Sequence, residues 1–127
     1  MSDEGLVLDK FGEFIVKTLR DETIEHFDIL AQGNWKAPAL QKLQNELKDF
    51  TEDQISVIKR CIINSIDAGI HSFLFSLQER ADFNNDIQII VDGNNVVEAS
   101  DGIHGEAFGE DGWYARFSKY GESPEEW

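Results

Sequence analysis

The segment Asp101-Gly102-Ile103-His104-Gly105-Glu106 has the strongest chemical character in this chain of 127 residues. Glycines before and after His104 let the backbone bring the imidazole close to the carboxylates of Asp101 and Glu106. Histidine and carboxylate side chains are the usual ligands of zinc, manganese and iron, and they also serve as general acids and bases. The segment is therefore a candidate metal or acid/base site, provided that other ligands approach it.

The missing ligands would come from a preceding helix that carries Asp67, His71 and Glu79 on its polar side. This interpretation predicts a divalent metal bound by His71, Glu79, His104 and Glu106, with Asp101 nearby. The spacing matches no established His–Glu metal motif. The same side chains also fit a structural polar network that holds the loop on the helix.

Other catalytic signatures are absent from the sequence. It contains no Walker A pattern, no dinucleotide fingerprint, no nucleophile elbow and no Cys-x-x-Cys. Ser100, Asp101 and His104 are neighbours in sequence, an arrangement that seldom gives triad geometry, and no oxyanion-hole motif accompanies them. We therefore favour a non-enzymatic function over an enzyme.

Charge is concentrated in the last third of the chain. The net charge is −14, and residues 81–127 contribute −9 of it, from eleven acidic and two basic residues. This surface repels nucleic acid and anionic membranes and attracts basic partners. Aromatic residues lie among the acids, and aromatic anchors supply contact energy while charge sets the on-rate. We expect a basic protein to bind at Asp101, Glu106, Glu110, Asp111, Trp113 and Tyr114.

A helix over residues 51–80 should position these groups. Thr51-Glu52-Asp53-Gln54 is a capping box, and no proline interrupts the next thirty residues. One apolar stripe is formed by Ile55, Ile58, Ile62, Ile66, Phe73 and Leu77, and a second by Val57, Cys61, Ala68 and Phe75. Two stripes predict a central helix that is covered on two sides, with Cys61 buried. A polar strip runs between them, with Arg60, Asn64, Asp67, His71 and Gln78.

The flanking segments predict an α+β fold in a single domain, with helices over residues 9–80 and a β-rich region over 81–127. We expect residues 1–8 to form a loose arm. A helix should begin after Asp9, bury Phe11, Ile15, Leu19, Phe27 and Leu30, and end at Gly33. Pro38 should start a short second helix. Strands over 87–91 and 96–99 should flank an Asp92-Gly93-Asn94-Asn95 turn, and a third strand is expected over 113–118. The three strands would form a small antiparallel sheet.

The single cysteine excludes an intramolecular disulfide, and the N-terminus resembles no signal peptide. No apolar run approaches the length of a membrane span. We therefore expect a cytoplasmic protein.

The acidic, aromatic C-terminal third, the small size and the lack of catalytic motifs together resemble bacterial immunity proteins, which neutralise basic toxins. The segments Ser100-Asp101-Gly102-Ile103-His104-Gly105-Glu106 and Gly112-Trp113-Tyr114-Ala115-Arg116-Phe117 are also similar to stretches of small uncharacterised bacterial proteins. The resemblance implies an acidic protein-binding domain with no cofactor. The alternative is a small metal-binding protein or acid/base enzyme at His71 and the 101–106 loop.

Overall fold

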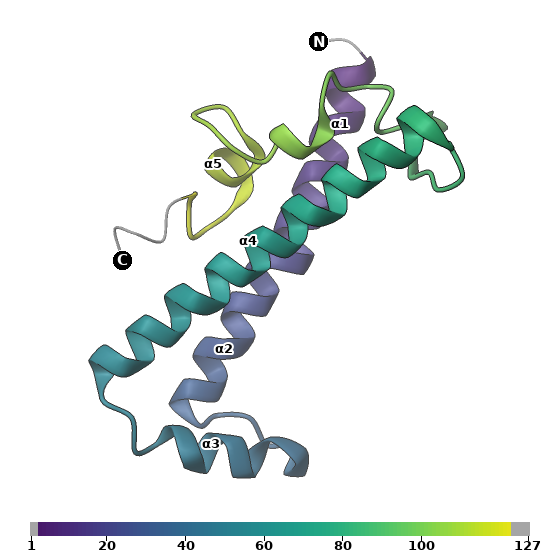
Figure 1. Cartoon of the computed structure of the whole chain (residues 1–127). Coiled ribbons are helices and arrows are strands. Elements are labelled where there is room, and N and C mark those ends of the chain that lie inside the picture. Colours follow the sequence, from purple (N-terminus) through teal and green to yellow (C-terminus); the bar gives the residue numbers. More distant parts are fainter. Residues whose placement is uncertain (1–2, 123–127) are drawn as a thin grey trace.

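A computed structural model describes residues 3–122 of the chain, which form two long antiparallel helical arms and a C-terminal lobe (Figure 1). The first arm runs without a break through α1 (Asp3–Ile15), the π-helix η1 (Val16–Asp21) and α2 (Glu22–Gln32). The second arm is α4 (Glu52–Phe83). The lobe, residues 84–122, contains β1 (Ile90–Val91), β2 (Asn94–Asn95), η3 (Ile103–Gly105) and α5 (Trp113–Phe117), and its residues 96–122 pack against one side of both arms.

The first arm begins earlier than the sequence predicts. Residues 3–8 are helical rather than a loose arm, because Val7 lies one turn before Phe11 and is buried in the same core. Asp9 is not an N-cap, and its carboxylate pairs instead with Arg116 of the lobe at 2.8 Å. Residues 1 and 2 lie outside the described residues.

The π-helix changes which side chains of this arm are buried. A regular four-residue spacing places Leu19 in the core after Ile15, but Leu19 is exposed and Arg20 is buried in its place. A π-turn contains one residue more than an α-turn, so the inward-facing position moves from residue 19 to residue 20. Phe27 and Leu30 are buried as predicted. The inserted residue therefore brings a cation into the protein interior.

The arms are joined by η2 (Pro38–Leu40) and α3 (Gln41–Leu47). Gly33 ends α2 in the left-handed conformation, at φ +73°, as its position predicts. The amides of Gly33 and Asn34 donate to the carbonyls of Leu30 and Ile29, the pattern of a Schellman motif. Pro38 occupies the first turn of η2, also as predicted.

The second arm begins at the predicted cap. The amide of Gln54 donates to the Thr51 hydroxyl at 3.1 Å, and the amide of Thr51 donates to the Gln54 side chain at 2.8 Å. The prediction that α4 is covered on two sides is wrong. Its buried positions are Ile63, Ile70, Leu74 and Leu77, whereas Phe73 and the second stripe of Val57, Cys61, Ala68 and Phe75 are exposed. The first arm and the lobe provide cover for only part of the helix surface.

The lobe contains two strands rather than three. Asp92 and Gly93 both have positive φ values, and the antiparallel hairpin pairs Ile90 with Asn95 and Val91 with Asn94. The returning strand is therefore Asn94–Asn95, inside the predicted turn, and the predicted strand over 96–99 is wrong because these residues form turns. The predicted third strand is wrong, since residues 113–117 form α5. Trp113 and Tyr114 are both fully buried. Consecutive side chains on a strand point to opposite faces, so a helical turn is what lets both of them enter one core.

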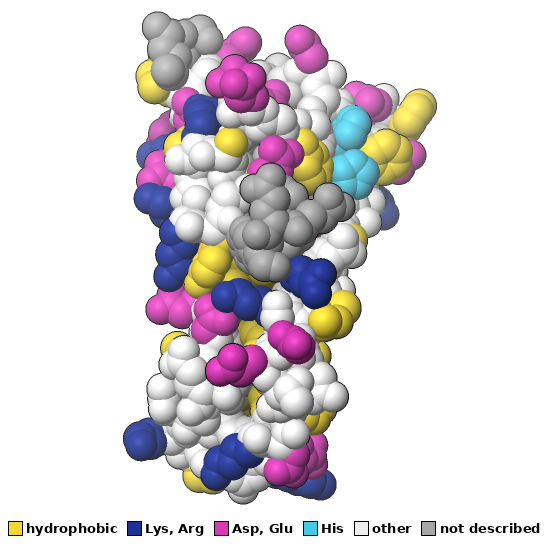
Figure 2. Space-filling view, turned by 90° about the vertical axis from the view of Figure 1, so that its left-hand side faces the viewer, with side chains coloured by type: hydrophobic (Ala, Val, Ile, Leu, Met, Phe, Trp, Pro, Cys, Tyr) yellow, Lys and Arg dark blue, Asp and Glu magenta, His cyan; other side chains and the backbone are white. Residues whose placement is uncertain are grey.

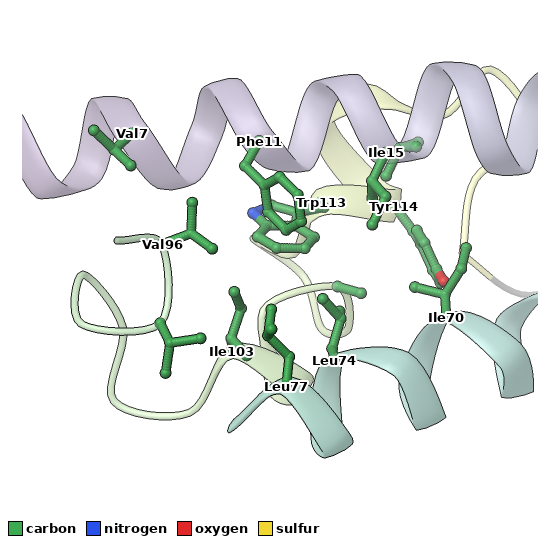
Figure 3. Close-up of a cluster of buried hydrophobic side chains, with 13 residues drawn as sticks. Val7, Phe11, Ile15, Ile70, Leu74, Leu77, Val96, Ile103, Trp113 and Tyr114 are labelled. Carbon is green, nitrogen blue, oxygen red and sulfur yellow. The ribbon is translucent and has the colours of Figure 1, made fainter. Parts of the chain in front are cut away.

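The main core lies between the arms and the lobe (Figure 3). Trp113 is at its centre, with the Phe11 ring edge-on at a centroid distance of 5.8 Å. Gly12 faces the Trp113 ring so closely that a side chain at this position would overlap it. The arms contribute Val7, Phe11, Ile15, Val16, Ile70, Leu74 and Leu77, and the lobe contributes Val96, Val97, Ile103, Ala107, Trp113 and Tyr114.

Arg20 links the two arms and the lobe by hydrogen bonds. Its side chain is 0% exposed, and its Nε and Nη2 donate to the two carboxylate oxygens of Asp67 at 2.6 and 3.1 Å. Its Nη1 donates to the Ser118 hydroxyl at 2.9 Å and to the Gly121 carbonyl at 2.6 Å. The guanidinium also lies over the Tyr114 ring, 4.0 Å from the centroid. We call this group of contacts the Arg20 clamp.

Asp21, the next residue of the π-helix, extends the clamp. Its carboxylate accepts hydrogen bonds from the Ser118 hydroxyl at 2.6 Å and from the Lys119 amide at 3.0 Å. Arg20 and Asp21 therefore both hold the segment that follows α5 through hydrogen bonds.

Replacing Asp67 with asparagine should destabilise the protein by about 3–5 kcal/mol, because it leaves the buried Arg20 cation without its counter-ion. Urea unfolding followed by circular dichroism measures this change. In the control Glu13→Gln, which breaks the exposed Glu13–Lys17 pair, we expect a loss below about 1 kcal/mol. Equal effects of the two substitutions would contradict the structural role given to Arg20.

Candidate functional site

The polar strip of α4 faces the lobe rather than solvent along part of its length. Asp67 belongs to the Arg20 clamp, and the Gln78 side chain accepts a hydrogen bond from the Ile103 amide at 3.2 Å. Between them, the rings of His71 and His104 meet edge to face with centroids 5.8 Å apart. The strip therefore attaches η3 to α4 and brings together the two histidines that the sequence marks as candidates.

Two phenylalanine rings complete this group. Phe75 lies 5.2 Å from His104 and 6.3 Å from His71, and Phe108 lies 5.9 Å from His71, all between ring centroids. We call His71, Phe75, His104 and Phe108 the His–Phe cluster. Phe75 is 43% exposed and Phe108 is 39% exposed, so the cluster is part of the surface. Figure 2 shows two histidine side chains in contact with hydrophobic ones on this face.

The acidic residues predicted to bind a partner lie around this cluster, in residues 101–111, which we call the acidic loop. Asp101, Glu110 and Asp111 are exposed, and Glu106 is half-buried, where it accepts a hydrogen bond from the Ser100 hydroxyl at 2.7 Å. Within residues 3–122, none of these four carboxylates forms a salt bridge. Their negative charge is therefore not neutralised by a neighbouring cation of the described chain.

The predicted metal ligands meet only in part. His71 and His104 are in contact, but among residues 3–122 no group of three or more His, Cys, Asp or Glu side chains is arranged to hold an ion. Glu79 is exposed one helical turn beyond Phe75, and Glu106 is engaged with Ser100. The Nδ1 atom of His104 is buried and has no hydrogen-bond partner in the described part of the chain.

Trp113 and Tyr114 do not belong to the surface that the sequence predicts for them. Both are 0% exposed and lie in the core behind the acidic loop. Burial raises the pKa of the Tyr114 phenol, and the nearby negative charge of Asp67 raises it further, so the side chain stays neutral. The exposed aromatic side chains at this site are instead Phe75 and Phe108.

Phe75 and Phe108 could have been recognised from the sequence only indirectly. Phe75 is the last member of the second apolar stripe. Because the sequence predicts that this stripe is covered, Phe75 is not expected at the surface. Phe108 lies between an alanine and a glycine in the acidic loop, with no periodic pattern to place it. What the two residues share in the sequence is an aromatic side chain over which no predicted helix or strand is expected to pack.

This chain matches no protein-family model, no curated protein and no solved structure. Among the helices of residues 3–122, none has both the length and the apolar character needed to cross a lipid bilayer.

The different burial of Trp113 and Phe108 predicts unequal effects on stability. Trp113→Ala should destabilise the domain by about 3–5 kcal/mol, as expected for a large side chain removed from a core. Phe108→Ala should lower stability by clearly less than this, because the ring is 39% exposed although it also packs edge-on against Tyr114. Circular dichroism of both variants tests this assignment, and a folded Trp113→Ala protein with wild-type stability would contradict it.

Proposed function

We propose that this chain is a non-enzymatic, acidic protein-binding domain that binds a basic protein partner through the acidic loop and the His–Phe cluster. The observation that supports this best is the position of four carboxylates without a salt bridge in the described chain beside two exposed phenylalanine rings. Exposed aromatic groups with a polar rim are typical of interaction sites.

The two kinds of side chain would contribute differently to binding. Unpaired carboxylates attract a basic partner over a distance of about 10 Å at 0.1 M salt, and this attraction raises the association rate. Phe75 and Phe108 would be buried in the complex and would set the dissociation rate, as aromatic anchors do. Their rings also offer faces to lysine or arginine side chains.

The partner class that fits this chemistry is a basic toxin, which makes the chain an immunity protein. Support comes from the overall character of the sequence: its small size, its net charge of −14 and the placement of the negative charge in the C-terminal third. A protein that neutralises a toxin needs a high association rate, and a concentrated negative surface provides it for a basic target.

The proposal predicts that charge at the acidic loop, not total charge, controls the rate of association. The partner for this experiment is a purified basic protein that the chain retains in a pull-down. Replacing Asp101, Glu106, Glu110 and Asp111 with their amides should slow association by about tenfold or more at low salt, and the difference should shrink as salt screens it. Stopped-flow measurements at several ionic strengths provide the rates.

The matched control replaces Glu22, Glu46, Asp49 and Asp53, four exposed acids that lie outside the lobe. It removes the same number of charges, so a specific site predicts a much smaller effect. Equal rates for the two fourfold variants would eliminate the acidic loop as the binding surface. Phe75→Ala should mainly speed dissociation.

A second candidate function is metal binding at the His–Phe cluster, and the contact between His71 and His104 favours it. Further ligands would have to come from water, from a partner, or from a movement of Glu79 or Glu106. If this pair binds zinc, a hundredfold excess over Kd should raise stability by about 2.7 kcal/mol, and the double change His71→Ala with His104→Ala should abolish the gain. Thermal melting that does not respond to zinc or chelator would reject this candidate.

A further inference from the structure

The two arms form a helical layer with two sides; residues 96–122 of the lobe cover one of them, and Ile89, in the earlier part of the lobe, lines the other (Figure 1). Gly12 and His71 face the lobe, through Trp113 and His104. Phe73 is two residues from His71, and two residues correspond to a rotation of about 200° around an α-helix, so it points away from the lobe. The side of the layer near Phe73 has its own surface, independent of the acidic loop.

This open side contains an apolar groove of about 400 Å³ between the two arms. The most exposed rings in it are Phe14, at 64%, and Phe73, at 47%. The remaining apolar lining is provided by Phe11, Ile15, Leu19 and Ile89. A helical layer with an uncovered apolar side normally packs against another layer, because each apolar stripe must be removed from water.

Thr18 is the one polar side chain in the groove lining. Its hydroxyl donates to the Phe14 carbonyl at 2.5 Å, and this local hydrogen bond satisfies the donor within the helix. Thr18 can therefore contribute its methyl group to an apolar contact without leaving an unpaired donor. The groove has no buried polar group that would require a specific ligand.

The charged residues around the groove neutralise one another. Lys10, one turn before Phe14, pairs with Asp92 at 3.0 Å. Lys17 pairs with Glu13 at 2.7 Å on the turn that contains Phe14. Arg80, two turns after Phe73, pairs with Asp86 at 2.7 Å. The three ion pairs cancel, and with the exposed Glu22, one turn after Thr18, this rim is close to neutral on a molecule of net charge −14.

Local neutrality and an apolar surface decide what can occupy the groove. A basic partner would be attracted to the acidic loop rather than to a neutral rim, whereas a second copy of this chain carries the same large negative charge and needs a neutral contact area. Two identical apolar surfaces can meet across a two-fold axis, the commonest symmetry of protein dimers. We propose that the groove of Phe14, Leu19, Phe73 and Ile89 binds the same groove of a second copy, giving a homodimer with a four-helix core.

The exposed area predicts a dimer that dissociates on dilution. Phe14 and Phe73 together leave roughly 200 Å² uncovered, taking roughly 200 Å² for each full aromatic side chain. Leu19, which also lines the groove, is exposed and adds to the apolar area. A standard interface buries about 800 Å² on each partner, so this contact is smaller than a standard interface and the dimer should be weak.

Sedimentation equilibrium across the micromolar to submillimolar range tests the proposal. We expect the wild-type protein to pass from monomer to dimer, with tighter association at high salt because salt screens the repulsion between two negative molecules. This salt dependence is opposite to that of the proposed basic partner, so the two proposals can fail separately. A monomer at every concentration and at both high and low salt would overturn the dimer.

The sharpest comparison uses two neighbouring phenylalanines of α4. Phe73→Glu places a charge in the groove and should weaken dimerisation by about a hundredfold or more. In the dimer each of the two copies would bury one added carboxylate in the interface. Phe75→Glu introduces the same charge two residues away, in the His–Phe cluster, and should leave dimerisation nearly unchanged. If Phe73→Glu does not fold by circular dichroism, Phe14→Glu on the other arm takes its place. Equal loss of the dimer in both α4 variants, or no loss in either groove variant, would overturn the assignment of the interface.

Discussion

The buried guanidinium of Arg20 imposes the arrangement on which the rest of the molecule depends. A charge that is removed from water must be paired and fully hydrogen-bonded, or the folded state is lost. All five of its N–H donors find acceptors: two in Asp67 of α4, and the others in Ser118, Gly121 and Glu122 of the lobe. Residues nearly a hundred positions apart are therefore held at one point, and the segment that follows α5 is fixed on one side of the arms.

This constraint originates in the π-helix. Without the extra residue of η1, the inward position would be that of Leu19, and the arms could pack through a purely apolar seam. The insertion exchanges that leucine for Arg20 and places Asp21 next to it, so the same turn provides both a cation and an anion for the lobe. Leu19 is moved outward to the open groove. One local irregularity therefore creates the attachment of the lobe and part of the uncovered apolar surface.

The sequence predicts the features of this fold that depend on short-range chemistry. The Thr51 capping box and the left-handed Gly33 each follow from a few neighbouring residues, and both are confirmed. The chain also reverses at Asp92 and Gly93, within the predicted four-residue turn, although the strand resumes earlier than predicted, at Asn94. Features decided by long-range packing are missed. The pattern of Trp113, Ala115 and Phe117 alternates as in a strand, but the core accepts both Trp113 and Tyr114 only from a helix.

In the candidate site, too, some features could be predicted from the sequence and others could not. The approach of His71 to His104 could be suggested because both lie in polar segments that lack other partners. The sequence gives no means of seeing that Glu79 and Glu106 do not join that pair: Glu79 is exposed, and Glu106 accepts a hydrogen bond from Ser100. The second stripe of α4 is a further example: its apolar spacing predicts burial, but spacing carries no information about whether a neighbour exists to cover it.

Phe73 and Phe75 place the two proposed surfaces on opposite sides of one helix, and this separation has a consequence for function. In a dimer formed through the groove, both acidic loops would remain at the outside of the assembly, free to bind. Two negative surfaces on one particle strengthen the field that attracts a basic partner. They would also let a partner with two basic sites bind twice, and the second contact would form at a high effective concentration. Dimerisation through a neutral groove would in this way increase binding without using any residue of the acidic loop.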